Sequence, residues 1–97
     1  MPKNRKVTAV IKGRSVLSAT HKRGALIIVF DDRSRMTVKT VAPAAPIPTA
    51  ARIKAVLEDD KQCALQFDDG SLLTIQLADP GASVSVRDRN GAVEYLG

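Results

Sequence analysis

A segment of the chain occurs twice, and this repeat constrains the fold more than any other feature of the sequence. Residues 24–39 and residues 61–76 align without a gap at a spacing of 37 residues. Phe30 then matches Phe67, and each phenylalanine is followed by two aspartates and, two residues later, by a serine. A repeated unit of this size is usually one supersecondary element, and two copies are too few for a solenoid. We therefore expect one domain, residues 1–97, with the copies at 13–40 and 50–77.

Each copy has the pattern of a β-hairpin, because apolar and polar residues alternate on both sides of a turn. In the second copy Asp69-Gly70 favours a two-residue type I′ turn. That turn would place Phe67 and Leu73 on opposite faces, whereas a three-residue loop at 69–71 pairs them on one face. A shift of one residue inverts every side chain, so the apolar match favours the longer loop. The apolar residues that it places together are Cys63, Leu65, Phe67, Leu73, Ile75 and Leu77.

The first copy supports the same loop. A three-residue loop at 32–34 pairs Phe30 with Met36 and Ile28 with Val38. Arg33 is also a poor residue for the positive φ that a type I′ turn requires.

The remaining segments are predicted as follows. Residues 15–20 match residues 52–57, and both are predicted strands. A helix is the alternative for 49–57, with Thr49 as N-cap, but Glu58, Asp59 and Asp60 would then crowd the negative end of its dipole. Residues 7–11 form an opening strand, and the proline-rich segment 41–49 is a semi-rigid connector.

The chain ends in a predicted hairpin over residues 82–97. Asn90-Gly91 is a strong two-residue turn signal, and it pairs Arg87 with Glu94 and Val86 with Tyr95.

The fold class that follows is all-β. We expect eight or nine short strands and at most one short helix, in a small barrel or in two packed antiparallel sheets. In strand length and turn spacing alone, the chain is similar to the SH3-like and Tudor-like small barrels.

The composition indicates what kind of core the protein has and in which compartment it is found. The chain has three aromatic residues, so its core must be aliphatic. It has no apolar run long enough to span a membrane, and its basic first six residues do not lead into a signal peptide. A single cysteine, Cys63, allows no internal disulfide, and this is compatible with a reducing compartment. We therefore expect a cytoplasmic protein.

The net charge of +5 is unevenly distributed. Residues 1–40 hold ten basic and two acidic side chains, a net charge of +8, whereas residues 41–97 hold five basic and eight acidic, a net charge of −3. Such asymmetry indicates either a nucleic-acid or acidic-surface partner on one half, or two oppositely charged faces that attract each other within the fold or between copies.

No residues suggest catalysis, a metal or a cofactor. Aspartates at 31, 32, 68 and 69 match a turn role better than a cation site, because neither loop supplies alternating ligands. His21 is expected in an exposed loop tip, and Cys63 on an apolar face, where a thiol is inert. We expect no enzyme, no cofactor, no metal and no small-molecule substrate.

The basic residues of the first half are the best candidates for function. Lysine and arginine contacts to phosphates supply the sequence-independent part of nucleic-acid affinity. We therefore expect a weak binding module for nucleic acid or for an acidic protein surface, led by backbone contacts because no exposed aromatic cluster is available for stacking. Residues 3, 5 and 6 are expected in a mobile arm. The candidates are Lys3, Arg5, Lys6, Lys12, Arg14, Lys22, Arg23, Arg33, Arg35 and Lys39.

The alternative is a structural protein that associates with itself as a homo-oligomer. Sheet edges could join two copies, and so could two loop tips of opposite charge that occupy equivalent places in the repeat. The residues of these tips are His21, Lys22, Arg23, Glu58, Asp59 and Asp60.

Overall fold

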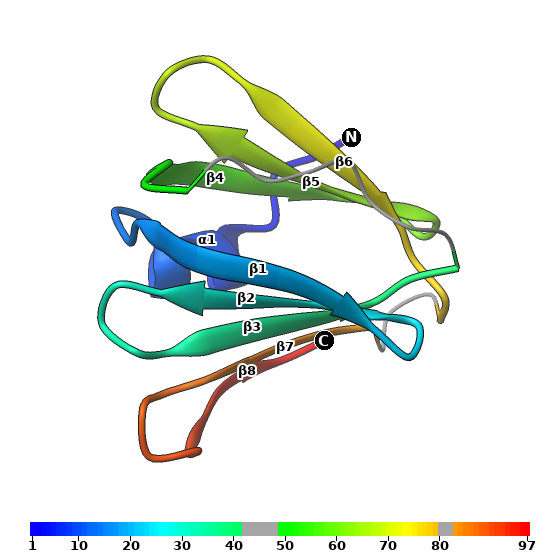
Figure 1. Ribbon diagram of the computed structural model, residues 1–97. Coiled ribbons are helices and arrows are strands. Elements are labelled where there is room, and N and C mark those ends of the chain that lie inside the picture. The colour runs from blue at the N-terminus through cyan, green and yellow to red at the C-terminus, as the bar shows by residue number, and fades with distance from the viewer. Residues whose placement is uncertain (42–48, 80–82) are drawn as a thin grey trace.

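The computed structural model describes residues 1–41, 49–79 and 83–97, which form two antiparallel sheets and one short helix (Figure 1). The five-stranded sheet has the order β1-β2-β3-β7-β8 and consists of β1 (Val16–Lys22), β2 (Ala25–Phe30), β3 (Arg35–Lys39), β7 (Val84–Arg87) and β8 (Val93–Leu96). The three-stranded sheet consists of β4 (Ile53–Glu58), β5 (Gln62–Phe67) and β6 (Leu72–Gln76). The predicted all-β class is confirmed, as two sheets that do not close into a barrel.

The two copies of the repeat form equivalent three-stranded units, β1–β3 and β4–β6. A bulge between Val16 and Ser18 in β1 recurs at the same place in β4. Two isolated bridges, Ser15 with Arg52 and Thr40 with Leu77, join residues that occupy the same position in each copy. The copies are therefore related by an approximate two-fold axis that passes near both bridges.

The core fills the space between the two sheets. The inward residues of both sheets form one cluster, with Phe30 and Phe67 at 0% and 1% exposure. The six residues predicted to share a face in the second copy are all buried. Strand 53–58 also confirms the strand prediction over the helix alternative.

The loops of the two repeat hairpins have the predicted length but lie one residue earlier than predicted. Leu65 pairs with Leu73, and the Phe67 amide donates to the Ser71 carbonyl, so the loop is 68–70. In the first copy Ile28 pairs with Met36, and the loop is 31–33. Moving the loop by one residue shifts the strand pairing by two, which leaves the faces unchanged. The position is set by the middle aspartate of each loop, which accepts the amide and hydroxyl hydrogen bonds of the following serine.

This loop requires a left-handed residue at its third position. Gly70 has φ 88° there, and Arg33 has φ 70°, so the expectation that Arg33 avoids a positive φ is wrong. A type I turn followed by a left-handed residue is the usual three-residue hairpin loop.

Arg33→Gly should therefore stabilise the protein by about 0.5–1 kcal/mol, because it removes left-handed backbone strain at an exposed position. This value is smaller than the strain itself, since glycine also increases the conformational entropy of the unfolded chain. The reciprocal change, Gly70→Arg, should destabilise it by a similar amount, since a Cβ there meets nothing within 4 Å and only backbone strain is added. Urea unfolding of both variants measures the two effects. Equal stability of all three proteins would contradict the expectation.

The C-terminal hairpin exists, but its turn differs from the prediction. Val86 pairs with Tyr95 as expected, whereas Arg87 lies opposite Val93 and not Glu94. Among the residues of this turn only Gly91 has a positive φ, whereas the predicted type I′ turn needs two. The loop therefore has three residues, as in the two repeat hairpins. Asp88 selects it by accepting from the amides of Asn90 and Ala92.

The opening strand predicted over residues 7–11 is wrong, because Arg5–Ile11 is the helix α1. β-branched residues favour strands, but Asn4 caps the Val7 amide, and Val7 and Ile11 lie one turn apart on a buried face. The helix packs against β4 and β8. Among the described residues no helix is long and apolar enough to cross a membrane. Most of the predicted connector, at 42–48, and residues 80–82 fall outside the described part of the chain.

Candidate nucleic-acid interface

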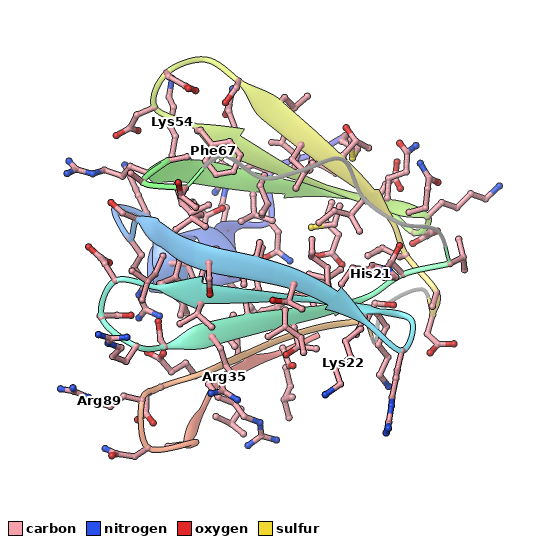
Figure 2. The ribbon with its side chains drawn as sticks, viewed as in Figure 1. His21, Lys22, Arg35, Lys54, Phe67 and Arg89 are labelled. Atoms are coloured by element: carbon pink, nitrogen blue, oxygen red, sulfur yellow. The ribbon has the colours of Figure 1, made fainter. Side chains whose placement is uncertain are left out.

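The outer face of the five-stranded sheet carries a group of cations. Strand alternation turns Leu26, Ile28 and Phe30 inward, so the residues between them face solvent. The strand register then places four exposed cations on that outer face: Lys22, Arg35, Lys39 and Arg87. Figure 2 shows Lys22 and Arg35 on the side of this sheet that is turned away from β4–β6. No outward-facing residue of β1, β2, β3 or β7 is acidic, and we call these four residues the cationic face.

The second copy serves as an internal comparison for this face. The positions equivalent to Lys22, Arg35 and Lys39 hold Asp59, Leu72 and Gln76. The equivalent strands have the same register and the same bulge, so the fold does not require the cations. The charge is therefore a property that distinguishes the first copy.

Three guanidinium groups gather at one end of the cationic face. Arg35, Arg87 and Arg89 line one recess beside the β7–β8 loop, together with Asp88, Asn90 and Gly91. Arg35 and Arg87 are direct cross-strand neighbours, an arrangement of like charges that destabilises a sheet. The carboxylate of Asp88 is occupied by two loop amides at 2.8 and 2.9 Å. An anion in this recess would relieve the repulsion between the arginines.

A second recess lies on the same face and offers hydroxyl groups. Its lining includes Thr37, Lys39, Ser85 and Leu96. Serine and threonine hydroxyls donate to phosphate oxygens in nucleic-acid complexes, beside the lysine and arginine contacts.

The structure brings together three of the ten predicted nucleic-acid-binding residues: Lys22, Arg35 and Lys39. The N-terminal group lies elsewhere, with Lys3 in a bridge to Leu57, Arg5 and Lys6 in α1, and Lys12 directly after it. The expected mobile arm is therefore wrong, because residues 2–4 pair with β4. Two further candidates occupy hairpin turns, Arg23 beside Gly24 and Arg33 in the loop 31–33.

Arg14 is used inside the molecule. Its guanidinium donates to both carboxylate oxygens of Glu94 at 3.0 Å and to the Ser34 hydroxyl at 2.9 Å, and Nε lies 3.2 Å from Asp32. Its hydrogen bonds to Glu94 raise the pKa of Arg14 against the opposing effect of partial burial. Arg14 thus joins the start of β1 to the β2–β3 loop and to β8, and its charge is already neutralised.

Of the residues predicted to form two oppositely charged loop tips, 21–23 and 58–60, only some lie in loops. His21 and Lys22 belong to β1, so the expected loop at His21 is wrong, and the turn is Arg23-Gly24. Glu58 accepts a hydrogen bond from Asn4 at 2.9 Å, and Asp59 accepts from the amides of Lys61 and Gln62 at 2.8 Å. Two of the three acidic residues therefore have structural tasks within the chain.

The residues considered for catalysis do not form a site. Burial raises the pKa of the Cys63 thiol to about 12, so the thiol is protonated at neutral pH. Within residues 1–41, 49–79 and 83–97 no group of three histidine, cysteine or acidic side chains could hold a metal ion. Tyr95 is half-buried, and its hydroxyl accepts from Asn4 at 2.9 Å, which makes it a poor stacking platform.

No family model, no curated protein and no solved structure matches the chain. The function must therefore be inferred from its own residues. Sequence reasoning missed Arg87 and Arg89, although the alternation of Val84 and Val86 with Ser85 and Arg87 indicates that Arg87 faces outward. What the sequence does not show is that β7 lies beside β3.

Proposed function

We propose that this protein is a non-enzymatic module that binds nucleic acid weakly through the cationic face, with little dependence on base sequence. One observation carries the proposal: four exposed cations share a sheet face without an outward carboxylate on β1, β2, β3 or β7, while the second copy has acidic or neutral residues at the positions equivalent to three of them.

The dimensions of the face suit a phosphate backbone. Arg35 and Lys39 are four residues apart on β3, a distance of about 13 Å along a strand. One strand of B-form DNA carries a phosphate about every 3.4 Å of helix axis, so this distance spans about four nucleotides. Hydroxyl donors between the cations favour phosphate oxygens, and an acidic protein surface is the competing ligand.

Titration of the protein with labelled single-stranded and double-stranded DNA tests the proposal. Four phosphate contacts predict that affinity falls roughly 50- to 150-fold between about 50 and about 200 mM salt, because each contact releases counterions. An acidic peptide should compete poorly. Absence of binding at the lower salt concentration, or binding that is insensitive to salt, would overturn the proposal, and equal competition by the peptide would favour an acidic protein partner.

A further inference from the structure

In the described part of the chain no strand pairs with the outer edge of β6, whereas β7 pairs with the equivalent edge of β3. The β5–β6 ladder uses the backbone groups of residues 71, 73, 75 and 77, so those of Leu72 and Thr74 point away from β5. No described strand pairs with this outer edge. In the first copy the equivalent residues, Arg35 and Thr37, pair with β7.

Other edges of the two sheets carry protection that β6 lacks. The outward backbone groups of β4 are occupied by Pro2, by the Asn4 amide and by the Thr8 hydroxyl. β1 contains a bulge and ends in Lys22, and β8 is four residues long and carries Glu94. Charges, bulges and short length are the usual ways to prevent edge pairing. β6 has the sequence Leu-Leu-Thr-Ile-Gln, without charge, proline or bulge.

We propose that β6 pairs in antiparallel orientation with β6 of a second copy of this chain. The two backbones meet about a two-fold axis at Leu73, so that Leu72 lies opposite Thr74 of the second copy. This register uses the outward backbone groups of Leu72 and Thr74, which have no partner among the described residues. It leaves out Gln76, whose carbonyl accepts from the Val41 amide at 3.3 Å. It joins the two three-stranded sheets into one sheet of six.

The equivalent edge in the first copy shows why β6 of a second molecule is suited to pair with the β6 edge. The strand that covers the equivalent edge is antiparallel and turns Val84 and Val86 inward beside the core. A second β6 would turn Leu73 and Ile75 inward in the same manner, and no like charges would meet across the pairing. Leu72, which is 53% exposed in the single chain, would gain a cross-strand neighbour.

The dimer has a consequence for the cationic face. A two-fold axis that joins antiparallel edges is perpendicular to the sheet, so both cationic faces turn to the same side. The dimer does not depend on nucleic-acid binding. If both proposals hold, one ligand could contact both copies, and linked binding would raise the apparent affinity.

Sedimentation equilibrium of the full chain, without nucleic acid, tests the dimer. We expect the mass to rise from 10.4 kDa toward twice that value between about 10 μM and about 1 mM, the range typical of weak transient contacts. Amide hydrogen exchange should slow at Leu72 and Thr74 as the concentration rises. A monomeric mass throughout, or protection confined to other strands, would overturn the proposal whatever the result with DNA.

Matched variants locate the contact. Leu72→Arg places the residue of the first copy in the second, and should weaken the dimer at least about tenfold, because a charge on an edge strand is one of the usual ways to prevent edge pairing. Leu17→Arg makes the same change at an exposed leucine on the β1 edge and should leave the mass unchanged. Thr74→Pro is a second disrupting variant, since it removes an outward N–H that has no partner in the single chain. A dimer that resists Leu72→Arg and Thr74→Pro but is lost with Leu17→Arg would contradict the assignment to β6.

Discussion

Replacement of all four residues of the cationic face by glutamine should weaken nucleic-acid binding roughly a thousandfold at about 100 mM salt. Each phosphate contact raises the affinity by about 0.7–0.9 log unit for each tenfold decrease in salt concentration below 1 M. The effects of the four contacts on affinity multiply. The dependence of affinity on salt should become nearly flat in this variant. Fluorescence anisotropy with the same labelled DNA measures both quantities.

A control variant separates the position of the charges from their number. Replacement of Lys3, Arg5, Lys6 and Lys12 by glutamine removes the same charge from exposed residues of the N-terminal segment. Because exposed charges are screened beyond about 10 Å, we expect this variant to lose less than about fivefold in affinity. Equal losses in the two variants would show that net charge alone drives binding and that the face has no special role.

Replacement of Arg14 by methionine should lower the free energy of unfolding by about 2 kcal/mol, because Glu94 loses a charged hydrogen-bond donor and Asp32 loses its ion-pair partner. The Arg14 and Glu94 side chains are 18% and 27% exposed, and their pairing is bidentate, so the loss should exceed that of an ordinary surface ion pair. Asp32 is 47% exposed and is expected to contribute less. Urea unfolding at neutral pH measures the change.

Further variants show whether the loss comes from these contacts. In the pair Arg14→Met and Glu94→Gln, the double variant should be less destabilised than the sum of the two single variants by about 1 kcal/mol. Lys54→Met, at an exposed position of β4, should change stability by less than about 0.5 kcal/mol. A stability of the Arg14 variant equal to that of the unchanged protein would contradict a structural role for this cluster.

Alternation of side chains made the core predictable, and the same rule explains the errors. Leu65 and Phe67 are two residues apart, and so are Leu73 and Ile75. Matching these apolar positions across the loop places them on one face. The period does not distinguish registers that differ by two residues, and hydrogen bonds of Asp69 made that choice. α1 was missed because Val7, Val10 and Ile11 are β-branched residues, which favour a strand, and their spacing also fits one face of a short helix.

The candidate site was only partly predictable for a related reason. Lys22, Arg35 and Lys39 lie within one copy of the repeat, where local hairpin pairing brings them together. Arg87 reaches Arg35 through the pairing of β3 with β7, which are far apart in the sequence. A pattern in one sequence carries no information on such long-range neighbours, so the recess between the arginines became visible only in the structure.

We propose that the outer face of β1, β2, β3 and β7 binds nucleic acid and that the second copy does not. Nuclear magnetic resonance of the ¹⁵N-labelled protein, titrated with a short DNA strand, tests it most directly. We expect the largest shifts at the amides of Lys22, Arg35, Thr37, Lys39 and Arg87 and at the guanidinium groups of the two arginines, with β4–β6 unchanged apart from the β6 edge. Shifts concentrated on α1 or on the outer face of the three-stranded sheet would contradict the claim.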